Sequence, residues 1–149
     1  MISESMKISG EVSLVLTGPD GKVKQEITRP NLVVDTGTAF IASRMEGTDD
    51  AVMSHMAIGS GTTTAAASDT DVESVLGVRE AIDTAVATNN QIVYTCGFEA
   101  GDGTGAVTEA GIFNASTGGS MLCRTVFPVV NKQADDVLTI TWTITISAS

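Results

Sequence analysis

The chain has 149 residues, of which 42% are hydrophobic and 17% are charged, and this size and composition predict one globular domain rather than two. Its 18 acidic and 8 basic residues give a formal net charge of -10, which repels phosphate backbones and excludes nucleic acid as an expected partner. No apolar run is long enough for a membrane span, and residues 1–7 lack the pattern of a secretion signal, so we expect a protein made in a cytoplasm.

Residues 8–28 are predicted to form an N-terminal β-hairpin. Large apolar residues share one parity along its first strand and recur on its second, and the turn at positions 18–21 is Gly-Pro-Asp-Gly. These apolar residues are Ile8, Val12, Leu14, Leu16, Val23 and Ile27. We expect residues 1–7 to form an N-terminal arm and residues 8–149 to form a single domain.

One short helix is predicted near residues 36–46. Asp35 and Thr36 are suited to cap its start, because their side-chain oxygens accept hydrogen bonds from the free N–H groups of a first turn. Gly47 marks its end. Four residues recur at helical spacing between these limits: Phe40, Ile41, Arg44 and Met45.

The middle of the chain is predicted to form strands separated by turns. A strand at 53–58 is followed by a glycine-containing, polar stretch at 59–70. A second hairpin joins residues 81–86 to 91–98, with Ile92, Tyr94, Cys96 and Phe98 on one face. After a loop at 101–105, a third pair of strands is expected at 109–114 and 121–130.

The last strand, at residues 136–147, has the clearest pattern. Its even positions from 138 to 146 are large and apolar, whereas its odd positions from 139 to 147 are all Thr or Ser. Successive strand side chains point to opposite faces, so this strand is predicted to have one apolar face and one hydroxyl face. Together, these segments predict an all-β fold, an antiparallel β-sandwich or jelly roll with one short helix.

No motif predicts catalysis or a cofactor. His55 is the only histidine and lies in a predicted strand, where a half-buried structural role is favoured over a triad base. The glycine-rich segments 59–62 and 101–105 lack the spacing of a P-loop or a dinucleotide-binding turn, which favours structural turns. Cys96 and Cys123 are far apart, without Cys or His companions, and are predicted to be buried thiols.

Acidic residues are the remaining candidates for chemistry. Asp69, Asp71 and Glu73 would allow a calcium site, but the segment lacks the central Gly and terminal Glu of an EF-hand, which favours solvated loop acids. Glu99 and Glu109 form the one conceivable pair for glycan hydrolysis, without other support. We therefore expect no catalytic, cofactor-binding or metal-binding residues and a protein that is not an enzyme.

A series of turn and strand motifs runs through residues 29–147. They lie at 31–37, 56–62, 73–80, 94–98, 108–113, 121–127, 132 and 136–146. Their order resembles that of small structural proteins of tailed bacteriophages, among them capsid decoration (cement) proteins and domains attached to tail fibres. The resemblance implies a β-sandwich without catalytic residues, made in the host cytoplasm and assembled on the virion as a trimer or dimer. The hairpin at 8–28 lies outside it and could be an added arm.

Five residues match these proteins most closely: Gly59, Gly61, Glu109, Gly111 and Phe113. The glycines are expected to permit positive φ angles and tight strand exits, and Phe113 with Ile112 to anchor a core strand. Glu109 is expected either to form a charge-assisted hydrogen bond with Arg79 or Arg124, or to be an ordinary exposed strand acid.

The resemblance implies one of two functions. As a capsid decoration protein on the virion surface, the chain would bind the major capsid protein and bridge capsomers, with avidity from many copies. Its hydroxyl face would then be either an intersubunit surface or a solvated outer face; it contains Thr139, Thr141, Thr143 and Thr145.

The alternative is a tail-fibre or baseplate-associated domain that contributes to host attachment. Loops 59–71 and 101–105 would then be recognition loops on a rigid sandwich. The single Trp and single Tyr lie on the apolar parity of their strands, which disfavours this alternative, because glycan binding usually requires exposed aromatic rings.

Overall fold

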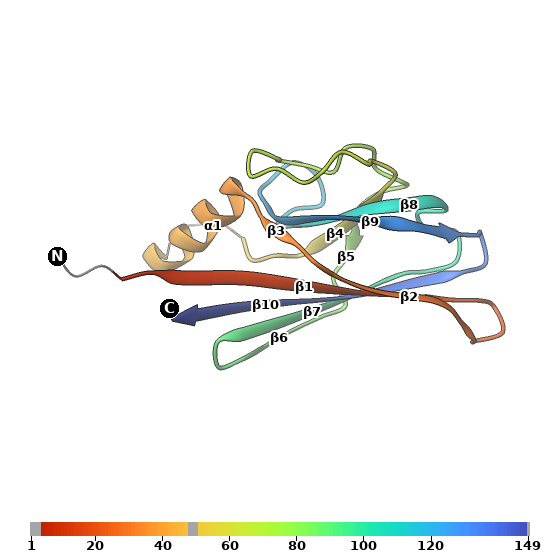
Figure 1. The fold of residues 1–149 in the computed structure, drawn as a ribbon, viewed down its shortest axis with the longest axis horizontal. Coiled ribbons are helices and arrows are strands. Elements are labelled where there is room, and N and C mark those ends of the chain that lie inside the picture. Colours follow the sequence, from red (N-terminus) through yellow and green to blue (C-terminus); the bar gives the residue numbers. More distant parts are fainter. Residues whose placement is uncertain (1–3, 48–50, 149) are drawn as a thin grey trace.

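The protein is a sandwich of two antiparallel β-sheets with one helix at its end (Figure 1). The computed structural model describes residues 4–47 and 51–148. Sheet A contains, in spatial order, β2 (Val23–Pro30), β1 (Met6–Thr17), β10 (Val137–Ala148), β7 (Gln91–Phe98) and β6 (Thr84–Thr88). Sheet B contains β3 (Leu32–Val33), β9 (Met121–Lys132), β8 (Gly105–Phe113), β4 (His55–Gly59) and β5 (Glu80–Ala81). The predicted fold class, an all-β sandwich with one short helix, is confirmed.

Strands β1 and β2 form the predicted N-terminal hairpin, but this hairpin is not an added arm. β1 pairs with β10 along its whole length, from Met6 opposite Ala148 to Thr17 opposite Val137. Its inward side chains, Val12 among them, belong to the main core. The expected arm at 1–7 also ends earlier than predicted, because β1 begins at Met6; residues 1–3 lie outside the described residues.

The main core lies between the two sheets. On β10, the even residues from Leu138 to Ile144 are at most 3% exposed, whereas the odd residues remain half-exposed, so the predicted alternation is confirmed. The indole N–H of Trp142 donates to Oδ1 of Asn31 at 2.9 Å. Asn31 precedes β3, so this bond joins the centre of sheet A to sheet B.

Helix α1 (Asp35–Glu46) begins where expected, but the predicted cap by Asp35 and Thr36 is wrong. The N-cap residue is Val34, and no side chain caps the first turn. The Thr36 hydroxyl instead donates to the backbone oxygen of Met121 at 2.7 Å, which attaches the helix to β9. The end is as predicted: Gly47 adopts a φ of 77°, and its N–H donates to the oxygen of Ser43.

The predicted strand at 81–86 is wrong, because this segment divides between the two sheets. β5 lies beside β4 at one edge of sheet B, and β6 lies beside β7 at one edge of sheet A. Ile82 and Asp83 connect them: the N–H of Ile82 donates to the oxygen of Ser54, and that of Asp83 to the oxygen of Thr95, both at 2.8 Å. The hairpin of β6 and β7 is confirmed from residue 84 onward.

Residues 60–79, here called the covering loop, lie over the outer face of sheet B (Figure 1). A second apolar cluster lies beneath this loop and is separate from the main core. It contains Val34, Ala57, Val72, Phe113 and Met121. Sheet B is therefore buried on both faces here, whereas sheet A is buried on its inner face alone.

Candidate functional site

Glu109 lies on the outer face of β8, beneath the covering loop, with none of its surface exposed. Its carboxylate accepts three backbone N–H groups of residues 61–74. The N–H groups of Gly61 and Ser74 donate to Oε2 at 2.6 and 2.8 Å, and the N–H of Glu73 donates to Oε1 at 2.7 Å. Such bonds compensate for the water that a buried carboxylate loses.

Arg124, on the neighbouring strand β9, supplies the opposite charge. Its Nη2 and Nε donate to Oε1 of Glu109 at 3.0 and 3.2 Å. Its Nη1 donates to the backbone oxygen of Thr63 and to Oδ2 of Asp69, both at 3.0 Å. The predicted charge-assisted bond therefore forms with Arg124, and the exposed-acid alternative is wrong because the covering loop buries this part of β8.

Arg79, the other predicted partner of Glu109, has a different set of contacts. Its guanidinium lies 3.5 Å from the centre of the Phe113 ring. Its Nη1 donates to the backbone oxygens of Ala115 and Gly118 at 3.0 and 2.8 Å, and Nη2 lies 3.5 Å from Oδ1 of Asp71. Arg79 thus joins the covering loop to the turn between β8 and β9, and the cation over the aromatic face adds a favourable contact.

The positive φ angles predicted for Gly59, Gly61 and Gly111 are wrong, because none of the three residues has one. Gly59 and Gly61 lie beside Glu109. The two glycines are required by close approach instead. A Cβ on Gly59 would lie 2.5 Å from the backbone oxygen of Ser74 and 2.6 Å from Oε2 of Glu109, and one on Gly61 would collide with the same carboxylate. The absence of both side chains lets the covering loop reach Glu109.

The three loop acids, Asp69, Asp71 and Glu73, have separate partners. Asp69 is not the predicted solvated acid, since it pairs with Arg124 and accepts the N–H of Ala66 at 2.9 Å. The exposed carboxylate of Glu73 accepts hydrogen bonds from Thr63 and Thr62, which lower the pKa of Glu73. Within residues 4–47 and 51–148, no group of three His, Cys, Asp or Glu side chains is arranged to hold a metal ion.

The other predicted residues are not brought together. His55 is half-buried on β4, as expected, and its Nδ1 lies 2.8 Å from Oγ of Ser54. Glu99 is exposed beyond the end of β7 in sheet A, so it does not face Glu109 under the covering loop. Cys96 and Cys123 are buried free thiols, and burial raises the pKa of Cys96 to about 12.

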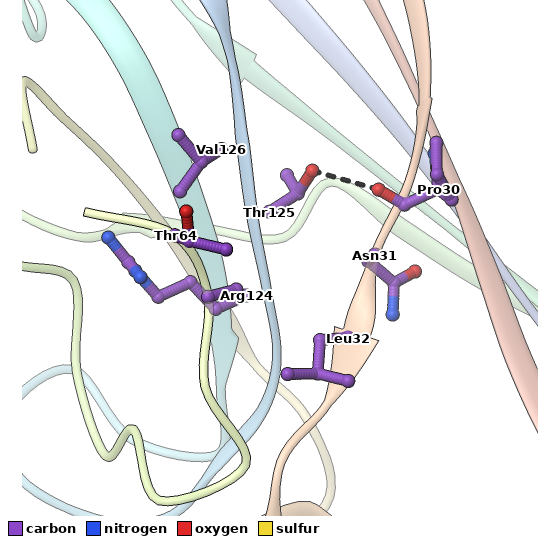
Figure 2. A pocket seen from close by; sticks show the side chains of 8 residues that line it. Pro30, Asn31, Leu32, Thr64, Arg124, Thr125 and Val126 are labelled. Carbon is purple, nitrogen blue, oxygen red and sulfur yellow. Dashed lines mark hydrogen bonds between the residues drawn. The ribbon is translucent and has the colours of Figure 1, made fainter. Parts of the chain in front are cut away.

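Figure 2 shows a shallow pocket of about 310 Å³ between β3, β9 and the covering loop. Arg124 points toward Thr64 of the loop, whereas Thr125 turns the other way and donates to the backbone oxygen of Pro30 at 3.0 Å. The Arg124 guanidinium is already engaged by Glu109, Asp69 and the loop backbone. The pocket is therefore part of the loop's attachment to sheet B.

The outer face of sheet A contains the hydroxyl face predicted for β10 and extends it onto the neighbouring strands, and we keep the name hydroxyl face for it. One row crosses all five strands with a hydroxyl side chain at every position, and strand pairing places its members directly opposite one another. The row is Thr28, Ser13, Thr141, Thr95 and Thr84. Each member is half-exposed or exposed. The sequence predicted the hydroxyl residues of β10. The contributions of the other four strands to the row were not predicted, because the pattern of a single strand does not show its register with its neighbours.

Comparison of the chain with protein-family models, curated proteins and solved structures gives no match. Among the described residues, no helix has the length and apolar character needed to cross a membrane.

Proposed function

We propose that this chain is a non-enzymatic structural protein of a tailed-bacteriophage virion, which decorates the capsid, binds the major capsid protein and bridges neighbouring capsomers. The observation that supports the proposal is the hydroxyl face, in which one row of hydroxyl side chains crosses five strands and remains accessible to solvent. Small hydroxyl side chains can exchange bonds with water for bonds with a protein partner, directly or through bridging water molecules.

The chemistry of the hydroxyl face suits a contact that is repeated many times. Thr and Ser offer many weak hydrogen bonds but no large apolar anchor, so a single contact of this kind would be weak. On a capsid, copies of a small oligomer contact several capsomers at once, and the high effective concentration after the first contact raises the overall affinity. A rigid sheet presents all of these contacts in one fixed arrangement.

The proposal is tested by adding the purified protein to capsids that lack it and locating it by cryo-electron microscopy. Regular density at capsomer junctions, with sheet A turned toward the shell, is the expected result. Density confined to the tail would replace the proposal with the fibre or baseplate role. Absence of binding to either part of the particle would contradict a virion role.

A matched pair of variants tests which surface binds. Thr141→Asp places a charge at the centre of the hydroxyl face, where its neighbours Ser13 and Thr95 are uncharged. Thr117→Asp makes the same change at an exposed position on the turn between β8 and β9. We expect the first variant to fold and lose capsid binding, and the second to bind like the wild type. Equal binding by both would exclude the hydroxyl face as the contact.

A further inference from the structure

The four edges of the two sheets differ in how they are protected against pairing with another chain. In sheet B, the edge strands β3 and β5 have two residues each. In sheet A, the edge strand β2 contains Lys24, Glu26 and Arg29 and ends at Pro30. Short length, charge and proline are the usual means of blocking an exposed edge.

The fourth edge, strand β6, has none of these protections. All five of its residues are exposed, and Val86 at its centre is 57% exposed. Its sequence, Thr-Ala-Val-Ala-Thr, contains no charge and no proline, and Val and Thr favour extended backbone. Figure 1 shows β6 at the free margin of sheet A, with β7 on its other side. Such an edge is a template for a further strand.

The sequence of β6 also reads the same in both directions. Around Val86, the alanines at 85 and 87 and the threonines at 84 and 88 are related by symmetry. An antiparallel partner with the same sequence, centred on Val86, would place Thr84 opposite Thr88, Ala85 opposite Ala87, and Val86 opposite itself. Every position would then meet a residue of equal or similar size, with no like charges facing each other.

The backbone of β6 has the parity that such a partner needs. The N–H of Ile146 on β10 donates to the oxygen of Asn90, so alternate residues along the adjoining β7, starting with Ile92, direct their backbone groups to β10. Val93, opposite Val86, therefore directs its groups to β6. By the same alternation, the backbone N–H and C=O groups of Val86 point to β7. Those of Ala85 and Ala87 point away from β7, toward the free side of the edge.

We infer that the partner of the β6 edge is a second copy of this chain, paired antiparallel across a two-fold axis at Val86. Ala85 and Ala87 of each copy would exchange backbone hydrogen bonds with Ala87 and Ala85 of the other. The two copies of sheet A then become one continuous sheet, and their hydroxyl faces lie on the same side. A two-fold contact of this kind is closed and yields a dimer. This inference does not depend on the virion role.

The net charge of the chain predicts a salt dependence that distinguishes this dimer from one held by ion pairs. Each copy carries a formal net charge of -10, so the two copies repel each other at long range, while β6 itself is neutral. At 0.1 M ionic strength, salt largely screens the repulsion between charges that are more than about 10 Å apart. The dimer should therefore strengthen as salt is added, the opposite of an association held by ion pairs.

The test is sedimentation equilibrium of the full chain across a range of concentration and salt. We expect a monomer–dimer equilibrium that shifts toward dimer with salt, and Val86→Lys should raise the dimer dissociation constant by about tenfold or more, because two lysines would meet at the two-fold axis. Val23→Lys, the same change at a residue of β2 that is 56% exposed, is the matched control and should leave the constant unchanged. A wild-type monomer at all concentrations, or equal dimerisation by Val86→Lys, would overturn the inference.

A cysteine at the two-fold axis gives an independent measurement. Val86→Cys should form a disulfide-linked dimer under mild oxidation, because directly opposite residues at a non-hydrogen-bonded position bring their Cβ atoms close. Val23→Cys on β2 should not, and the native Cys96 and Cys123 are buried, so they do not compete. Equal crosslinking at both positions would indicate random collision and contradict a specific β6 contact.

Discussion

On sheet B, the outer face carries a buried ion pair and an apolar cluster, and the chain's own covering loop lies over it. On sheet A, the outer face carries one row of hydroxyl groups in register across five strands, and they remain accessible to solvent. Both faces belong to strands of the same sandwich. The difference is in side-chain chemistry: one face is built to be covered by its own chain, and the other is compatible with water.

The comparison shows what covering a sheet face requires. Glu109 and Arg124 are nearly free of solvent exposure, at 0% and 2%, and every contact described for them is with the covering loop or with each other. A buried charge without such partners would cost several kcal/mol, which is comparable to the net free energy of unfolding of a whole domain. The hydroxyl face of sheet A carries no such requirement, so it can be exposed or bound without reorganisation.

The largest effect is expected from a charge on the inner side of β10. Trp142→Asp would place a carboxylate without a partner in the core, where Trp142 is fully buried, and should abolish folding. Thr141→Asp, one residue earlier on the outer face, should fold with a loss of about 1 kcal/mol or less. Circular dichroism and urea unfolding measure both. Equal destabilisation by the two variants would contradict the assignment of faces.

The second-largest loss of stability is expected at the ion pair of sheet B. Glu109→Ala would remove the fully buried countercharge of Arg124, which would keep its pair with Asp69, and would remove the acceptor of three N–H groups, at a cost of about 3–5 kcal/mol. Urea unfolding measures this loss, and hydrogen exchange of residues 60–79 should increase.

Glu73→Gln is the matched control for the ion pair, because Glu73 is exposed and keeps an acceptor oxygen after the change. It should cost about 0.5 kcal/mol or less. If Glu109→Ala lost no more stability than this control, the covering loop would not depend on the buried pair.

A smaller effect is expected from the space beside Glu109. Gly61→Ala adds a Cβ that collides with the Glu109 carboxylate and with Glu73, and overpacking of this kind costs about 1–3 kcal/mol. Ser60→Ala is the control, since Ser60 is exposed and contacts Ser74 through its backbone. Thermal unfolding of both variants tests close approach as the reason for the glycine; a stabilised Gly61→Ala would exclude it.

The smallest effect is expected from acid, at the turn that joins the two sheets. Asp136 accepts hydrogen bonds from Lys24 and from the N–H of Gln133, both at 2.8 Å, and these lower its pKa from the ordinary value of 3.8. Because the folded pKa is the lower one, Asp136 stabilises the fold above the unfolded pKa, and this contribution is lost as pH falls through the folded pKa.

Asp136→Asn should therefore flatten part of the acid branch of the stability curve, as measured by urea midpoints from neutral to strongly acidic pH. Lys24→Met, which removes the charged side-chain donor, should flatten it in the same direction but less, since the bond from Gln133 remains. An unchanged acid branch in both variants would show that Asp136 does not contribute to it.

The sequence was sufficient to predict the two faces of a strand where that strand is buried on one side only. The alternation of β10 from Leu138 to Ser147 predicted both of its faces, because a period of two directly reports which side chains meet the core. The strand pair β8 and β9 was also located. Its faces could not be assigned, because the covering loop buries both of them and removes the alternation.

The ion pair left a signal that could have been used. Glu109 and Arg124 are single charges within apolar stretches of two predicted neighbouring strands, and opposite charges so placed indicate a buried pair. Other features had no local signal. The division of residues 81–86 between two sheets depends on partners that are distant in sequence, and so does the close approach at Gly61.

The pairing of β1 with β10 has a consequence for the time at which the protein can fold. Strands from opposite ends of the described chain lie side by side at the centre of sheet A, so a ribosome makes β1 long before its partner exists. Until β10 emerges, the inward residues of β1 have no neighbour to cover them on that side. Contacts of such long sequence separation form slowly, and we expect the nascent chain to need protection from aggregation until β10 has been made.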